Sequence, residues 1–160
     1  MVKMAKGPYM EFLRGKAQQT ANNTYAETQI PTPTSKTENM AMLIHSVELV
    51  PSALAPITPA NAAVMEAHLA KRTQAAVITL IDPDLIANYH VLTILNAVFN
   101  ELAFRGEQKQ TFDPPLLYPH ANLFLGISTS GFASTRFVEC RIGYTLEKVS
   151  REDFISALVE

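Results

Sequence analysis

The sequence predicts a mainly β protein, built as an antiparallel β-sandwich or barrel, and two observations support this. Residues 136–149, RFVECRIGYTLEKV, alternate between apolar and polar side chains. One face would hold Val138, Cys140, Ile142, Tyr144 and Leu146. Because successive side chains of a strand point to opposite faces, this predicts a long strand with one buried face, central in its sheet. In addition, short strands recur between proline-rich corners, which is typical of sandwiches and barrels rather than βαβ units.

A short helix is predicted directly after this strand, over residues 151–159. Ser150 is a suitable N-cap, and Asp153 can close a capping box with it. The segment carries apolar side chains at helical spacing, namely Phe154, Ile155, Leu158 and Val159. We therefore expect the helix to pack over one end of a sheet, and the fold to include one or two short helices in all.

Three further strands are predicted. Residues 40–50 form the first, ended by Pro51. Its alternation places four side chains on one face, namely Leu43, His45, Val47 and Leu49. The apolar run at 75–81, AAVITLI, predicts a buried strand, and NLFLGIS at 122–128 predicts another. The loop 128–135 would join this last strand to the final one as a hairpin.

Other segments leave more than one structure open. Residues 61–72 fit either a helix or a strand. Asp82 is a good N-cap with Pro83 behind it, so a helix is predicted to start there and could run to residue 103. HVLTILNAVF at 90–99 could instead become a strand. Residues 101–111 predict a polar loop, followed by a stiff extended corner at 113–115.

The charge distribution divides the chain into a basic, polar N-terminal arm over residues 1–24 and one β domain over residues 25–160. The chain as a whole has a formal net charge of −2 and a pI near 6.1, so it carries no global signature of nucleic-acid binding. The arm differs, because it holds four basic side chains against Glu11, namely Lys3, Lys6, Arg14 and Lys16. These four are predicted to contact nucleic-acid phosphates.

The sequence offers little catalytic chemistry, so we expect no enzyme, no metal and no cofactor. The histidines lie on separate elements without metal-ligand spacing, at positions 45, 68, 90 and 120. The one cysteine, Cys140, falls on the buried face of the last strand and predicts an inert thiol. There is no glycine-rich phosphate loop and no nucleophile elbow. Without a signal peptide or an apolar run long enough to span a membrane, a cytoplasm-like setting is expected.

Three segments resemble small single jelly-roll coat proteins of viruses: QIPTPTSKTENMAMLIHSVEL, QTFDPPLLYPHANLFLGIST and FVECRIGYTLEKVSREDFISALVE. The resemblance covers residues 25–160 and implies an eight-stranded jelly roll. It further implies a non-catalytic subunit that is made in a host cytoplasm and assembles into a virion with copies of itself, other capsid components and the genome. The outward face of the last strand would then meet a neighbouring subunit through Phe137, Glu139 and Arg141. A helix at 83–103 would be an insertion between strands.

Two alternatives remain open at this point. LIDPDLIANYHVLTILNAVF resembles the helical part of a small subunit of the tRNA-threonylcarbamoylation complex, which would make the chain a partner-binding subunit with 83–103 as its central helix. That interpretation leaves the long final strand unexplained. The other alternative is a β binding module with an open ligand surface.

Overall fold

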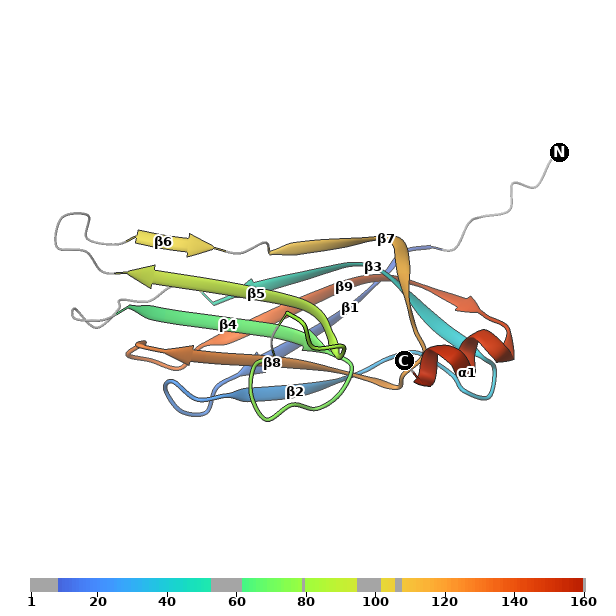
Figure 1. Cartoon of the computed structure of the whole chain (residues 1–160), viewed down its shortest axis with the longest axis horizontal. Helices are drawn as coiled ribbons and strands as arrows, with labels where there is room; N and C mark the ends of the chain where they lie inside the picture. The colour runs from blue at the N-terminus through green and yellow to red at the C-terminus, as the bar shows by residue number, and fades with distance from the viewer. Residues whose placement is uncertain (1–8, 53–61, 79, 95–101, 106–107, 160) are drawn as a thin grey trace.

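The computed structural model describes residues 9–52, 62–78, 80–94, 102–105 and 108–159 of the chain. The described part is mainly β, with two antiparallel sheets and a C-terminal helix (Figure 1). Sheet A has the order β1 (Glu11–Gln18), β9 (Phe137–Lys148), β3 (Met40–Pro51), β7 (Lys109–Tyr118). Sheet B has the order β2 (Ala26–Pro31), β8 (Asn122–Ser130), β4 (Ala63–Ala70), β5 (Leu85–Ile94), β6 (Leu102–Arg105). The helix α1 spans Arg151–Val159.

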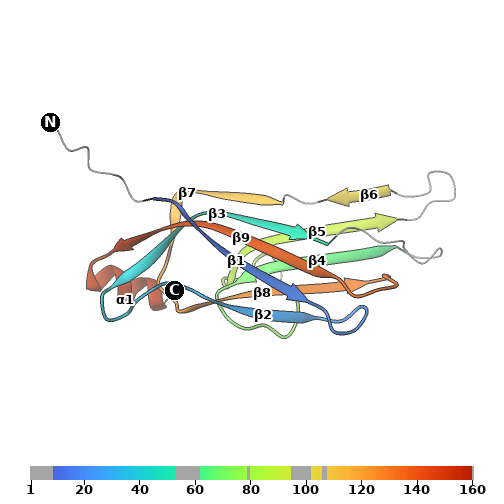
Figure 2. The same cartoon turned by 180° about the vertical axis from the view of Figure 1, so that it is seen from behind.

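The two sheets face each other (Figures 1 and 2), and the side chains between them form one hydrophobic core. Sheet A contributes Met42, Ile44, Leu49 and Ile142, all almost fully buried. Sheet B contributes Met65, Leu69, Tyr89, Leu123 and Leu125. Full burial of such a side chain contributes about 1.5–3 kcal/mol each, so this shared core holds the two sheets together.

Strand β9 confirms the alternation that predicted it. Val138, Cys140 and Ile142 are buried, whereas Glu139 and Arg141 are exposed. The strand is central in sheet A, because it pairs with β1 on one side and with β3 on the other. Its two faces are therefore a core face and an outer face of sheet A.

Strand β3 departs from strict alternation, which corrects one prediction. Its register shifts between Ile44 and Ser46, in a β-bulge. A bulge inserts one extra residue and so reverses the faces on its far side. Ile44 is consequently buried together with Val47, while Leu43 and His45 lie on the outer face. The prediction that Leu43 and His45 share a face with Val47 was wrong for this reason.

The helix predicted from residue 83 is also wrong in the described residues, since β5 occupies Leu85–Ile94 and β6 occupies Leu102–Arg105. The Asp82 carboxylate does accept a hydrogen bond from the Asp84 amide, at 2.9 Å, but this closes a turn before a strand. Tyr89 and Val91 then alternate into the core as strand residues do. Residues 95–101 lie outside the described residues.

Three neighbouring predictions change as well. Residues 63–70, left open between helix and strand, form β4. The run at 75–81 is no strand where it is described, and Leu80 and Ile81 are 74% and 92% exposed. The predicted polar loop at 101–111 includes β6 and the start of β7.

The predicted final hairpin does not form, because β8 and β9 belong to different sheets. Strand β8 pairs with β2 and β4, whereas β9 pairs with β1 and β3. The connection between them therefore crosses from sheet B to sheet A. Gly131 starts this crossing with a φ of 77°, a conformation that glycine adopts without strain.

Helix α1 begins as predicted. The Ser150 hydroxyl accepts a hydrogen bond from the Asp153 amide at 3.1 Å and donates to the Asp153 carboxylate at 2.6 Å. Phe154 is buried, but Ile155 and Val159 are 50% and 79% exposed. The apolar stripe is thus only partly covered. No helix among the described residues is long and apolar enough to cross a membrane.

Residues 11–18, which the sequence assigned to the N-terminal arm, form strand β1 at the edge of sheet A. Leu13, Gly15 and Ala17 face inward, while Phe12 and the basic side chains at 14 and 16 face outward. The alternation of β1 is difficult to recognise in the sequence, because the inward position 15 is a glycine and not an apolar side chain. The structure leaves no room for one, since a Cβ atom at Gly15 would lie 2.2 Å from the Ile30 Cδ1 atom. Residues 1–8 of the arm lie outside the described residues.

Candidate functional site

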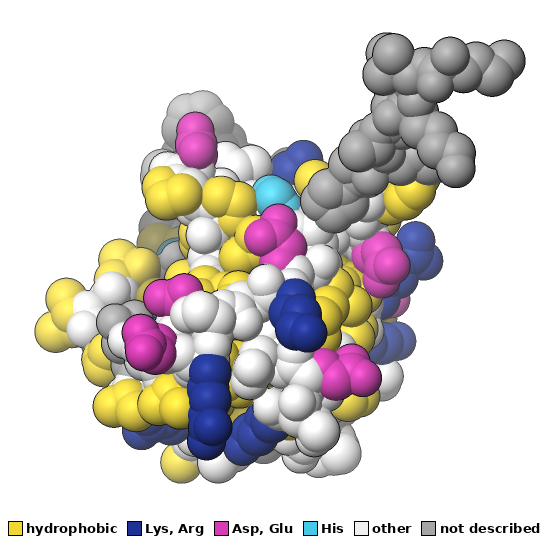
Figure 3. Space-filling model, turned by 90° about the vertical axis from the view of Figure 1, so that its right-hand side faces the viewer, with side chains coloured by type: hydrophobic (Ala, Val, Ile, Leu, Met, Phe, Trp, Pro, Cys, Tyr) yellow, Lys and Arg dark blue, Asp and Glu magenta, His cyan; other side chains and the backbone are white. Residues whose placement is uncertain are grey.

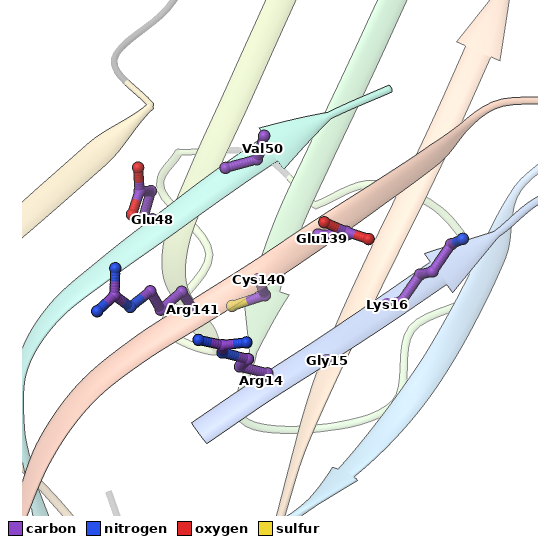
Figure 4. Close-up of a pocket in the computed structure, with 8 residues that line it drawn as sticks. All are labelled: Arg14, Gly15, Lys16, Glu48, Val50, Glu139, Cys140 and Arg141. Carbon is purple, nitrogen blue, oxygen red and sulfur yellow. The ribbon is translucent and has the colours of Figure 1, made fainter. Parts of the chain in front are cut away.

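The outer face of sheet A carries a groove of about 500 Å³ across β1, β9 and β3 (Figure 4). Antiparallel pairing arranges its side chains in rows. In one row Lys16 lies opposite Glu139, and Glu139 opposite Val50. In the next row Arg14 lies opposite Arg141, and Arg141 opposite Glu48. The groove is therefore built by residues that are neighbours only because the three strands pair.

The predicted site residues that the structure describes all lie on this face. Arg14 and Lys16 come from β1, and Phe137, Glu139 and Arg141 come from β9. The sequence had assigned these residues to two separate functions, nucleic-acid contact and a subunit interface. The pairing of β1 with β9 joins them into one surface. Lys3 and Lys6 lie outside the described residues.

Sequence reasoning missed the contribution of β3 and of Phe12. Glu48 and Val50 alternate with the buried Val47 and Leu49, so their outward direction could have been read from the sequence. Their position beside Arg141 could not, because the pairing of β3 with β9 joins segments far apart in the chain.

Two of the cations on this face lie over aromatic rings. The Arg141 guanidinium is 3.9 Å from the centre of the Phe12 ring, and the Lys16 ammonium is 4.0 Å from that of Phe137. Such contacts are worth about 0.5–1 kcal/mol at exposed sites. Within the described ranges, no carboxylate lies within 4.0 Å of the cationic groups of Arg14, Lys16 or Arg141. The positive charge of these groups is thus directed to solvent.

Cys140 lies beneath the groove rather than in it. Its side chain is 2% exposed, on the inward face of β9 as predicted. Burial raises the pKa of the thiol to about 12. A thiol with so high a pKa is protonated at neutral pH and is a poor nucleophile. The groove therefore offers charge and hydrogen-bond donors, and Cys140 adds no nucleophile to it.

A second polar cluster lies on the outer face of sheet B, beneath the segment that connects β4 to β5. The Glu27 carboxylate is its centre. It accepts hydrogen bonds from the Tyr25 hydroxyl at 2.8 Å, the Thr73 hydroxyl at 2.5 Å and the Gln74 amide at 2.8 Å. Because Thr73 and Gln74 belong to the connecting segment, Glu27 fastens that segment to the sheet (Figure 1).

His68 lies at the bottom of this cluster with no exposed surface. Its Nε2 atom is 3.4 Å from the Tyr25 hydroxyl, and the two rings are stacked. Burial lowers the pKa of His68, against the opposing effect of the Glu27 and Asp82 carboxylates. Burial also raises the pKa of Tyr25, as does its hydrogen bond to Glu27. His68 is therefore enclosed within the folded subunit.

The two faces differ in access. The groove on sheet A can receive a ligand, whereas the His68 cluster is closed by the segment above it. No group of three or more His, Cys, Asp or Glu side chains in the described parts of the chain is placed to hold a metal ion. Comparison with protein-family models and with curated proteins finds no match.

Proposed function

We propose that the fold is a single jelly roll and that the chain is a coat subunit that assembles with copies of itself into a closed shell around nucleic acid. The observation that carries this proposal is the pattern of strand pairing. With the short β6 set aside, the first strand pairs with the eighth and the second with the seventh, as β1–β9 and β2–β8. The third pairs with the sixth and the fourth with the fifth, as β3–β7 and β4–β5.

This pairing is what results when one long hairpin is rolled up into two facing sheets. Two Greek keys and eight strands define a jelly roll, which is found in viral coats, lectins and cupins. Strand β6 then extends one edge of sheet B beyond β5. Because a fold alone does not give a function, the choice of a coat subunit needs support from the surface.

The two outer sides of the subunit differ in charge. Around the groove, sheet A carries four cations against Glu48 and Glu139, namely Arg14, Lys16, Lys109 and Arg141, while Asp113 and Glu147 are exposed farther along the same sheet. The outer side of sheet B carries four acidic groups against Lys71 and Arg72, namely Glu27, Glu66, Asp82 and Asp84. A shell subunit of this kind can turn a basic face toward a polyanionic cargo and an acidic face away from it.

Exposed apolar side chains provide contacts for neighbouring subunits. They are Tyr9, Met10, Phe12, Val50, Leu80, Ile81, Ile155 and Val159. Figure 3 shows that apolar side chains are interspersed with charged ones over the end of the molecule that it displays. Interfaces between copies of one chain are commonly built from such mixed surfaces. The tRNA-complex alternative has no such support, because the helix that it needs is replaced by strands in the described part of 83–103.

Sedimentation velocity and light scattering of the full-length protein test the proposal, across protein concentration, salt and added nucleic acid. We expect particles of uniform size, visible by negative-stain microscopy. A strict monomer or dimer under every condition would overturn the coat function and leave a β binding module.

A variant sharpens this experiment. Ile81 is almost fully exposed, so Ile81→Asp should leave the subunit folded. If the exposed apolar loop contacts a neighbour, the variant should raise the protein concentration needed for assembly. Thr37→Asp, at another exposed position, is the matched control for the added charge.

A further inference from the structure

We propose that the groove on the outer face of sheet A binds the phosphodiester backbone of single-stranded nucleic acid, with Arg14 and Arg141 as its central contacts. This rests on the proposed function in one respect, that the basic face is the one turned toward the cargo. It moves the main nucleic-acid contact from an N-terminal arm to the folded sheet.

The first support is a like-charged pair. Arg14 and Arg141 lie directly opposite each other on adjacent strands. Like charges in that position destabilise a sheet, and opposite charges there stabilise it. Arg141 also lies opposite Glu48 on its other side, and in the next row Lys16 lies opposite Glu139, so Arg14 is the groove cation that faces only a like charge. A pair of arginines with no carboxylate within 4.0 Å, among the described residues, is the arrangement that an anion between them would stabilise.

The second support is the geometry of the two guanidinium groups. Arg14 and Arg141 are both exposed, and their side chains extend in the same direction from neighbouring strands (Figure 4). Cβ atoms directly opposite in a sheet are about 4.5–5.5 Å apart, so the two groups can converge on one phosphate. Guanidinium groups bind phosphate through two parallel hydrogen bonds, and the Phe12 ring beneath Arg141 orients that group.

The third support concerns the class of ligand. Lys16 is two residues from Arg14 on the same face, about 7 Å along the strand, so it can contact a following phosphate. Phe12, 48% exposed, and Phe137 lie on the same face. Cations that follow a backbone beside aromatic rings are the general pattern of proteins that bind single strands without sequence preference. Glu48 and Glu139 also line the groove, so binding should depend on few phosphates and weaken in salt.

The test is fluorescence anisotropy with a labelled twenty-residue oligothymidylate, between 0.05 and 0.3 M salt (about the range in which phosphate contacts are lost). The double variant Arg14→Gln/Arg141→Gln removes the contacts to one phosphate, so it should reduce the slope of log affinity against log salt by about 0.7. At about 0.1 M salt this corresponds to a roughly 5-fold loss of affinity.

Two double variants with the same loss of charge serve as controls. Lys3→Gln/Lys6→Gln removes the cations of the N-terminal arm, and Lys36→Gln/Arg72→Gln removes cations away from the groove. We expect the second control to bind as the unmodified chain does. An equal loss in all three double variants would show a diffuse effect of net charge and overturn the site. A loss confined to the arm variant would also overturn it.

The same experiment separates this site from the proposed function. Binding is measured at protein concentrations where sedimentation shows no particles, so that assembly does not contribute. If particles form but Arg14→Gln/Arg141→Gln binds unchanged, the site fails and the coat function stands. If no particles form under any condition but the groove variant loses affinity, the site stands and the coat function fails. Binding to vesicles of anionic lipid without binding to the oligonucleotide would overturn the choice of ligand.

Discussion

The outer faces of the two sheets are both built from antiparallel strands. They differ in whether their polar side chains are exposed or covered by another segment of the chain. On sheet A the side chains of Arg14, Lys16 and Arg141 are exposed to solvent. Among the described residues, no carboxylate lies within 4.0 Å of their charged groups. On sheet B the Glu27 carboxylate is fastened by three donors, and His68 beneath it is fully buried. The difference comes from what lies above each sheet. The segment between β4 and β5 covers part of sheet B, and the groove of sheet A stays open.

On these two faces, burial decides the role of each polar group. A carboxylate withdrawn from solvent costs free energy unless it is hydrogen-bonded, and the half-buried Glu27 carboxylate has three donors in the folded subunit. An exposed guanidinium is satisfied by water and can exchange that water for a ligand. The closed face therefore serves stability, whereas the open face is free for binding.

The largest expected effect separates the two sides of β9. Ile142→Asp would place an unpaired carboxylate in the shared core, where Ile142 has no exposed surface. We expect a loss of about 4 kcal/mol or more, enough to prevent soluble expression of a typical domain. Arg141→Asp changes the next residue, which faces solvent, and should leave the subunit folded. Thermal unfolding and yield measure both, and equal tolerance would contradict the assignment of the faces.

A second pair of variants compares the closed and open faces directly. A Cβ atom at Gly126 would lie 2.6 Å from the His68 Nε2 atom and 2.7 Å from the Tyr25 hydroxyl oxygen. Because the cluster is sealed, Gly126→Ala should displace the stacked rings and cost about 1–3 kcal/mol. At Gly143 the closest contact is the Ser46 hydroxyl oxygen at 2.8 Å, which can rotate away beneath an exposed Phe12.

Gly143→Ala should therefore cost clearly less than Gly126→Ala, as measured by urea unfolding. Similar losses would mean that the outer face of sheet A is as tightly packed as the His68 cluster. If Gly126→Ala mainly speeds proteolysis within residues 71–84, the substitution disturbs the segment that covers sheet B.

Several features of the two sheets could be predicted from the sequence alone. The period of two in β9, the capped helix α1 and the inward direction of Cys140 follow from local pattern, and the structure agrees. The coarse class, mainly β with a C-terminal helix, follows from the same signals. The exposed run at Leu80 and Ile81 is apolar enough to imitate a buried strand, so local pattern failed there.

The remaining wrong predictions concern segments whose structure depends on which other strand they pair with. Asp82 and Pro83 signal a helix start as well as a turn, and only the pairing of β5 with β4 decides between them. The bulge in β3 arises from its register against β7 and β9, which no local pattern contains. The groove was missed as a unit for the same reason, because Glu48 and Arg141 become neighbours only when strands from distant parts of the chain pair.

A third prediction uses the pH dependence of the closed face. Burial lowers the pKa of His68 below its usual value of 6.5, and that of His120 shifts in the same direction. Histidines whose pKa is lowered in the folded state bind protons more readily when the chain unfolds. Their contribution to stability is therefore complete above about pH 6.5 and is lost as the pH falls below that value.

Unfolding free energies between about pH 5 and pH 8 should show this loss, and His68→Gln should reduce it. His90→Gln is the matched control, because the side chain of His90 is 49% exposed and lies on the open part of the same sheet. A pH dependence that is identical in the unmodified chain and in His68→Gln would show that His68 is not protonated on unfolding in this range.

The smallest expected effect belongs to the open face and has the opposite sign. In the described part of the chain the side chain of Arg14 has no hydrogen bond or ion pair, and it faces Arg141 across β1 and β9. Removing one member of a like-charged pair should stabilise the sheet, by about 0.2–1 kcal/mol. Arg14→Gln should therefore raise the melting temperature in low salt, and the difference should vanish near 0.5 M salt, where charges about 5 Å apart are largely screened.

Lys36→Gln, at an exposed position in the β2–β3 connection, removes the same charge without removing a facing cation, so its melting temperature should not rise. A fall in stability for Arg14→Gln at low salt would mean that Arg14 holds the folded sheet together. In that case Arg14 and Arg141 would be a structural element of the subunit, and the open face would lose its main reason for attracting an anion.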